Sequence, residues 1–309
     1  MGKYSGTPVR SSSFENILYE KRHWVATVTI NRPKVHNCLN LATLRELGIA
    51  FQDAAWDDHI AVLILTGTGD KAFCTGADLK EWKEDFLDHP SDFHKWMGVF
   101  IETFERLRNV GKPTIARLNG IVVGGGNELQ MSCDLAVAAD DIYIRHVGTE
   151  HGSVPAAGAA QWLPIIIGDR RAREMLFLCE PIPAKKALEW GLVNEVVPRV
   201  ELDRAVNRMA ARLIKKLPEC TRYTKQQLNF WRELSWSLTI GHLRDWLTVH
   251  TASNEIVESI NAFVEKRPVD YEKIRMQMVG ERREKSEVRN QKSGVRRKRR
   301  DTGPGKRRS

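Results

Sequence analysis

Apolar and polar residues alternate near the start of the chain in a pattern that predicts a β-hairpin. The alternation covers residues 17–20 and 24–30, and the polar residues 21–23 between them mark the turn. Pro33 ends the second strand, because proline has no N–H to donate to a neighbouring strand. An uninterrupted apolar run at residues 60–66 has the length and character of a buried strand.

Helical spacing of apolar residues alternates with further short strands. The spacing predicts a helix over about residues 41–55 and another over residues 93–107. Short apolar runs at 114–118 and 134–138 predict two more strands. The repeated order of strand, glycine-rich loop, helix and strand predicts an α/β fold with a mostly parallel sheet.

The last third of the chain reads as helical from about residue 170 onward, with one strand at 192–197. The expected helices cover residues 171–179, 184–190, 201–217, 221–233 and a long stretch near 239–266. Such a subdomain either covers the α/β core or supplies a subunit interface. We therefore expect four parts: a flexible N-terminus at 1–12, an α/β core at 13–200, a helical oligomerisation subdomain at 201–275, and a disordered basic tail at 276–309.

The charge is distributed very unevenly along the chain. The whole chain carries a formal charge of +9, but residues 281–309 hold 13 lysines and arginines against 4 acidic residues, and residues 1–280 carry 35 of each sign. The tail has only valine as an apolar residue and cannot bury enough surface to fold. It is either a solvated, dispensable extension or a segment that contacts nucleic acid or an anionic surface.

Composition narrows the class of protein further. Hydrophobic residues make up 42% of the chain and charged residues 28%, which is typical of a globular protein. No apolar run approaches 18 residues, and the N-terminus lacks the apolar segment of a secretory signal. The five cysteines are scattered without C-x-x-C spacing, which argues against a zinc site or a disulfide framework. We therefore expect a cytoplasmic protein that contacts no membrane and holds no metal.

Two glycine-rich loops are the first candidates for chemistry. Residues 75–78 and 124–128 each follow a predicted strand and precede a helix. Their backbone amides are either part of tight turns or converge on a ligand, where they would stabilise a developing oxyanion. Neither loop matches a nucleotide-phosphate motif. Glu128 is either a charge at the start of a helix or, beside such a loop, a proton donor or base.

A polar cluster of His146, Glu150 and His151 lies in a later loop. Its members are either polar loop residues without a function or part of a site. His36 and His94 are isolated, which favours surface positions. No serine stands in a G-x-S-x-G motif, so the sequence offers no serine-hydrolase nucleophile.

A series of motifs stands in fixed order along the chain. Its members are Asn31-Arg32-Pro33 with Asn37, Phe73 with Gly76-Ala77-Asp78-Leu79, Lys112-Pro113, Asn119-Gly120 with Gly124-Gly125-Gly126 and Glu128-Leu129, Cys133-Asp134, Gly152 with Pro155 and Gly158, Ala184 with Ala187, Gly191-Leu192-Val193, Val196-Val197, and residues 262–267. This ordered series resembles the crotonase (enoyl-CoA hydratase/isomerase) superfamily, and the resemblance runs from about residue 14 to about residue 275.

The resemblance implies a spiral of ββα units with a C-terminal helical subdomain that builds homotrimers or homohexamers. It implies an acyl-CoA substrate and no cofactor besides that coenzyme A. The oxyanion donors would be the amides of Ala77 and Gly125, and Glu128 would be the catalytic carboxylate. The positions that would contact substrate or coenzyme A, the last two from a neighbouring subunit, are Arg32, Lys34, His36, Asn37, Lys71, Phe73, Thr75, Gly76, Asp78, Leu79, Gly124, Phe263 and Lys266.

The sequence departs from the hydratase pattern at one position. The second glutamate of the family stands seven residues before the proline of G-x-x-P. In this chain that proline is Pro155, so the position is occupied by Gly148, and Glu150 stands two residues further on. The predicted activity is addition of water to an enoyl-CoA thioester, with isomerisation or ring-opening hydrolysis of a cyclic oxo-acyl-CoA as alternatives. For the last, residues 71–76, 149–153 and 218–220 are similar to the 6-oxocyclohex-1-ene-1-carbonyl-CoA hydrolase group.

Overall fold

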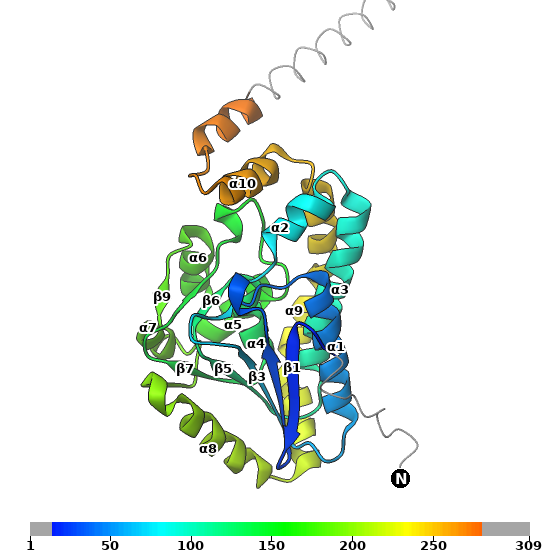
Figure 1. The fold of residues 1–309 in the computed structure, drawn as a ribbon, viewed down its shortest axis with the longest axis vertical. Helices are drawn as coiled ribbons and strands as arrows, with labels where there is room; N and C mark the ends of the chain where they lie inside the picture. The colour runs from blue at the N-terminus through cyan, green and yellow to red at the C-terminus, as the bar shows by residue number, and fades with distance from the viewer. Residues whose placement is uncertain (1–13, 280–309) are drawn as a thin grey trace, which may run out of the picture. The chain divides into compact units, whose positions relative to one another are not determined.

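The computed structural model describes residues 14–279 and divides them into two units between Ile260 and Asn261. The first unit holds two β-sheets and nine α-helices within residues 14–260, drawn in Figure 1. In the second unit, residues 261–265 complete a helix and residues 271–279 form another. The basic tail from residue 280 onward lies outside the described residues. The expected boundaries at residues 200 and 275 stay predictions.

The first sheet has six strands in the order β1-β2-β3-β5-β7-β10 and confirms the predicted hairpin. β1 and β2 are antiparallel, and every other neighbouring pair is parallel. His23 and Trp24 form the turn with φ of 50° and 70°, so Trp24 lies in the turn rather than at the start of the predicted strand. The strands are β1 (Ile17–Arg22), β2 (Val25–Ile30), β3 (Val62–Gly67), β5 (Thr114–Leu118), β7 (Leu135–Ala139) and β10 (Glu195–Val197).

A second, smaller sheet has the order β4-β6-β8-β9, and its strands were not predicted. Its members are β4 (Ala72–Cys74), β6 (Ile121–Val123), β8 (Tyr143–Arg145) and β9 (Ile182–Pro183). Strands of two or three residues are too short to produce a period in the sequence. The successive pairs β3 and β4, β5 and β6, and β7 and β8 each give one strand to each sheet, which confirms the spiral of ββα units.

The helices agree with the predicted pattern except near the end of the first unit. A break was expected between residues 233 and 239, but α9 runs through it without interruption, and the chain breaks at 251–253 instead. The short helices at 79–86 and 125–132 are those expected directly after the two glycine-rich loops, whereas the helix at 159–167 was not predicted. The α-helices are α1 (Leu41–Trp56), α2 (Leu79–Glu81), α3 (Pro90–Arg108), α4 (Gly125–Ser132), α5 (Ala159–Ile167), α6 (Asp169–Leu178), α7 (Ala184–Glu189), α8 (Leu202–Ile214), α9 (Pro218–His250) and α10 (Asn254–Glu265).

Helices cover both faces of the first sheet. α1 contacts β1 and β2, while α8 contacts β3, β5 and β7 from the opposite side of the strands (Figure 1). β3 is buried along its whole length for this reason, whereas β1 alternates between buried and exposed residues. No helix in residues 14–279 combines the length and the apolar character needed to cross a membrane.

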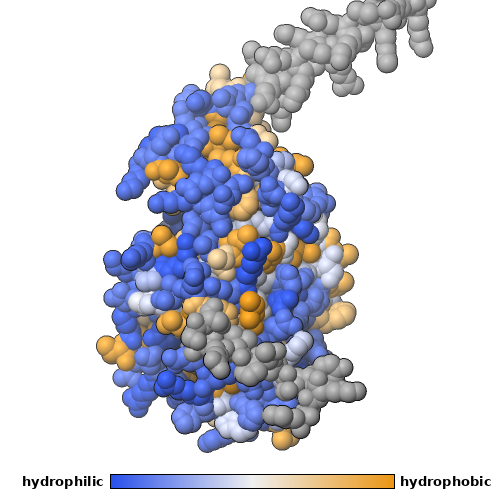
Figure 2. All heavy atoms as spheres, turned by 45° about the vertical axis from the view of Figure 1, so that its right-hand side comes forward, coloured by the Kyte–Doolittle hydropathy of each residue, from blue (hydrophilic) through white to orange (hydrophobic). Residues whose placement is uncertain are grey.

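α9 exposes much of its apolar surface within the first unit. Trp236 and Leu247 are buried, but Leu228, Trp231 and Leu234 are exposed. Figure 2 shows apolar side chains in separate patches on one mostly hydrophilic face of the molecule. α9 thus carries more apolar side chains than it buries against the rest of its unit.

Candidate active site

The two glycine-rich loops meet because β4 and β6 are adjacent parallel strands. Residues 75–78 follow β4, and Gly124 follows β6, so both loops leave the same edge of the second sheet. Gly76 has φ of +85°, and a Cβ there would lie 2.9 Å from the Gly125 nitrogen. A Cβ at Gly126 would lie 2.0 Å from the Cys74 carbonyl oxygen. Only glycine permits this approach of the loops, so the glycines are more than turn residues.

Two backbone amides are left available at this junction. Leu39 pairs with Ala77 in a short parallel bridge, in which Leu39 N–H donates to Gly76 O and Leu39 O accepts from Asp78 N–H. Both bonds use the neighbours of Ala77, so the N–H of Ala77 itself points away from Leu39. Gly125 begins α4, where the first amides have no intrahelical acceptor. Neither amide donates to a carbonyl within residues 14–279. Both residues line one cavity, where such amides can stabilise an oxyanion.

That cavity has a volume of about 100 Å³ and an aromatic wall. Trp82, Trp96 and Phe100 form the wall, and none of the three was predicted as a site residue. Trp96 and Phe100 lie within the helix predicted over residues 93–107. The remaining lining residues are Thr75, Gly76, Ala77, Leu79, Gly124, Gly125, Glu128, His146, Val147, Gly148, His151, Ser153, Val154 and Ala156.

Glu128 is the carboxylate of this cavity and is only 2% exposed. Its Oε1 accepts hydrogen bonds from the backbone N–H groups of Ala157 and Ala159, at 2.7 and 3.2 Å. Its Oε2 accepts none from the described residues. The donors belong to the segment that enters α5 rather than to the first turn of α4. Glu128 therefore does not cap its own helix, and its carboxylate is held in one orientation at the cavity.

Two histidines also line the cavity. His146 directly follows β8, and its Nε2 lies 3.9 Å from Glu128 Oε1. This Nε2 is buried and has no hydrogen-bond partner among residues 14–279. Burial lowers the pKa of the His151 imidazole, which favours its neutral form. The polar cluster predicted from the sequence thus lies partly inside the site.

The third member of that cluster lies elsewhere. Glu150 is ion-paired to Arg145, and it is not among the residues that line the cavity. Gly148 does line it, so the position where the family carries a second glutamate faces the cavity without a side chain. A catalytic role of Glu150 stays a prediction that this placement does not favour.

The residues predicted to contact coenzyme A lie in several different places. Lys34, His36 and Lys71 line a second cavity of about 280 Å³, whereas Phe73 is buried in the core. Phe263 and Lys266 belong to the second unit, and their role stays a prediction. The members that line the first cavity are Thr75, Gly76, Leu79 and Gly124.

The remaining predicted contacts, Arg32, Asn37 and Asp78, hold two loops of the chain together. Arg32 donates to Asp78 at 2.9 Å and to the carbonyl of Cys38. The Asn37 side chain is fully buried; it accepts from Arg32 N–H and donates to the carbonyls of Thr68 and Ala72. These bonds hold the loop at residues 31–38 against the loop at residues 68–78.

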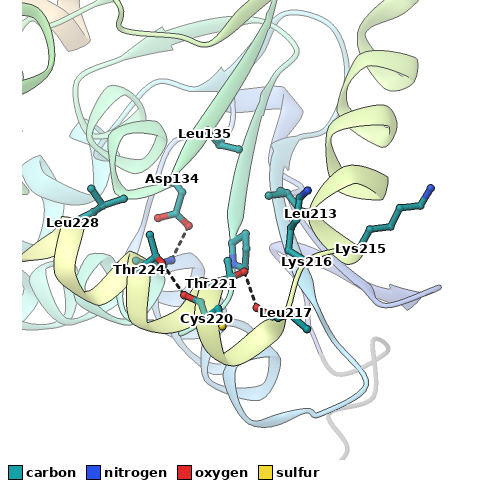
Figure 3. A pocket seen from close by; sticks show the side chains of 12 residues that line it. Asp134, Leu135, Leu213, Lys215, Lys216, Leu217, Cys220, Thr221, Thr224 and Leu228 are labelled. Atoms are coloured by element: carbon teal, nitrogen blue, oxygen red, sulfur yellow. Dashed lines mark hydrogen bonds and ion pairs between the residues drawn. The ribbon is translucent and has the colours of Figure 1, made fainter.

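A larger cavity of about 590 Å³ lies between the end of α8, the start of α9 and β7 (Figure 3). Its Asp134 carboxylate is ion-paired to Lys225 at 2.8 Å, and the hydroxyls of Thr221 and Thr224 donate to carbonyls of α9 and the residue before it. The Asp134 carboxylate and both threonine hydroxyls are thus already paired within the protein. The smaller cavity, where donors and a carboxylate face open space, is the candidate active site.

Thiol chemistry at this site is disfavoured by burial. Cys74 lies beside the first glycine loop, and its Sγ accepts from Gly76 N–H at 3.4 Å. Burial raises the pKa of its thiol to about 12, so the nucleophilic thiolate is not populated near neutral pH.

Comparison with known proteins agrees with this geometry. The family model described as enoyl-CoA hydratase/isomerase matches residues 20–274. The short-chain-enoyl-CoA hydratase of Clostridium acetobutylicum is 32% identical over 255 residues, which is 82% of this chain and 97% of that protein.

The match to solved structures with the same fold extends over nearly the whole length of those structures. The enoyl-CoA hydratase of Mycobacterium avium subsp. paratuberculosis superposes with a TM-score of 0.76 at 25% identity, over 84% of this chain and 99% of that one. The enoyl-CoA hydratase of Bacillus anthracis gives a TM-score of 0.67 at 31% identity, over 83% and 99%.

Proposed function

Because the chain belongs to the enoyl-CoA hydratase/isomerase family, we propose that it adds water across the double bond of an enoyl-CoA thioester. The observation that carries this proposal is the Glu128 carboxylate, fixed by two backbone amides beside the free amides of Ala77 and Gly125. A carboxylate next to an oxyanion site is the arrangement that water addition to a conjugated thioester requires.

The proposed reaction follows from this arrangement. The amides of Ala77 and Gly125 donate to the thioester oxygen and polarise the conjugated double bond. Glu128 accepts a proton from water as the water oxygen bonds to the β carbon. The negative charge collects on the thioester oxygen as an enolate, which is then protonated at the α carbon. The thioester itself accepts the electron pair, so the proposed reaction uses no metal or redox cofactor.

The size and charge of the two cavities support a short acyl group on coenzyme A. The cavity at Glu128 is small, about 100 Å³, and the Clostridium relative is a short-chain-enoyl-CoA hydratase. The second cavity carries Lys34 and Lys71, whose charges suit the phosphates of coenzyme A.

Isomerisation of the double bond is the second candidate, because Gly148 leaves the cavity with one carboxylate. Isomerisation moves a proton between two carbons and needs no water. Nothing in the comparisons supports a cyclic acyl group, and residues 281–309, on which the nucleic-acid alternative depends, lie outside the described chain.

The test is an assay of the purified chain with crotonyl-CoA, with saturated butyryl-CoA as the control. We expect loss of the absorbance of the conjugated thioester and a product heavier by one water, with no change in butyryl-CoA. A 3-enoyl-CoA converted to its 2-enoyl isomer without gain of mass would favour isomerisation. Failure of both conversions across acyl lengths would refute the proposal.

We further propose that the exposed apolar residues of α9 are buried between subunits in a trimer or a hexamer. Light scattering at micromolar concentration measures this directly, and a monomeric mass would contradict it. A cytoplasmic location remains a prediction from the scattered cysteines.

A further inference from the structure

We propose that His146 is the second proton-transfer residue of this site and replaces the carboxylate that is missing at Gly148. This inference rests on the proposed function and names a catalytic residue for it. It starts from the position of His146 at the edge of the second sheet. β6 and β8 are parallel and paired, and Gly124 N–H donates to Arg145 O. His146 therefore lies next to the glycine loop that supplies the oxyanion donor.

The hydrogen bonding of His146 is the observation that carries the argument. The residue is 3% exposed, yet its Nε2 has no partner within the described structure. Buried polar atoms are rarely left unpaired, and each exception calls for an explanation, such as a catalytic role or a bound group. The distance of 3.9 Å from Nε2 to Glu128 Oε1 is too long for a hydrogen bond. Both side chains line the same cavity, so a substrate or water there can contact both.

The other candidates for this role are less well placed. Gly148 has no side chain, and Glu150 is ion-paired to Arg145 outside the cavity lining. His151 lines the cavity and is the competitor that an experiment must exclude.

The proton balance closes with Glu128 and His146 alone. With a carboxylate on Glu128 and a protonated His146, the carboxylate takes one proton from water as the water oxygen bonds to the β carbon. The π electrons move to the thioester oxygen, then return as the α carbon takes the Nε2 proton. This leaves a protonated Glu128 and a neutral imidazole. Transfer of the proton from Glu128 to His146 through a water in the cavity that both side chains line restores both groups, and the net change is addition of one water.

The first experiment compares three glutamine variants in the crotonyl-CoA assay. We expect His146→Gln to lower kcat by a factor of about 10²–10⁴, with the affinity for coenzyme A products within about threefold of the parent. His94→Gln is the matched control, because His94 contacts Thr248 outside the cavity, and we expect it to leave the rate unchanged. We expect His151→Gln to reduce kcat by less than His146→Gln does.

A second measurement separates proton transfer from a structural effect. In D₂O the parent is expected to exchange the α hydrogen of the 3-hydroxyacyl-CoA product, and His146→Gln to lose this exchange. Added imidazole is expected to restore part of the rate of His146→Ala and none in Glu128→Gln. This rescue also keeps the test decisive if His146→Gln folds poorly.

The outcomes distinguish this inference from the proposed function. If the parent hydrates crotonyl-CoA and His146→Gln does so equally fast, the role of His146 is refuted while the function stands. A loss confined to His151→Gln, or retained exchange without rescue, refutes it too. A parent that is inactive on every enoyl-CoA refutes the function itself.

Discussion

Replacing Glu128 tests the central feature of the site, because two different substitutions separate its chemical role from its structural one. In Glu128→Gln the amide oxygen can still accept from the Ala157 and Ala159 N–H groups, so we expect the fold to be retained. The amide cannot exchange protons near neutral pH. We expect turnover to fall by about 10²–10⁴, which corresponds to about 3–5 kcal/mol in the activation barrier.

Glu128→Ala adds a structural loss to the chemical one. Two buried amides lose their acceptor, and each unsatisfied group costs about 1–3 kcal/mol. We therefore expect roughly 2–6 kcal/mol of destabilisation, or a melting temperature lower by several degrees, beyond that of Glu128→Gln. Steady-state kinetics measures the turnover, and thermal unfolding measures the stability of the two variants. Full turnover in Glu128→Gln, or equal stability of the two variants, would refute this reasoning.

Three further substitutions test the surroundings of the carboxylate. In Gly125→Val the new Cβ would lie 3.3 Å from Gly76 Cα, so we expect the oxyanion position to be blocked and turnover to fall by about 10² or more in the same assay; an unchanged rate with an intact fold would contradict the role of this amide. Phe100→Ala is expected to cost about 3–5 kcal/mol and to shift kcat/KM toward longer acyl chains, whereas Phe104→Ala, buried beside it but outside the cavity, is expected to cost as much without that shift. Asn37→Ala removes the partner of Arg32 N–H and of Thr68 O and one of the two donors to Ala72 O, at a φ of +56°, so we expect a lower melting temperature; a value equal to that of the parent would contradict this expectation.

The sequence predicts the elements that repeat a period and misses those that do not. α1 and α3 were found because their apolar faces span several turns, whereas the three-residue strands β4, β6 and β8 contain no period to find. The false break in α9 has a tertiary cause. Trp236 stacks on Trp162 of α5 with ring centroids 5.2 Å apart. A contact with a different helix leaves no mark in the local spacing of apolar residues.

Much of the candidate site could be anticipated, but its supporting contacts could not. The two glycine loops and Glu128 were recognised from composition and motif order. The amides that hold Glu128 come from about thirty residues further along the chain, and backbone donors leave no mark in a sequence. His146 belonged to a recognised polar cluster, but its distance from Glu128 depends on the pairing of β6 with β8.

The way Glu128 is held has a consequence for how this protein can evolve. Its partners are the peptide groups of Ala157 and Ala159, so the hydrogen bonds themselves require no particular side chain, and burial in the core is what limits those two positions. The constraint falls on the residue between them. Gly158 has φ of +111°, and a Cβ there would lie 2.4 Å from the Trp162 ring. Selection for the acid–base function would therefore be recorded at a glycine that contributes no functional group.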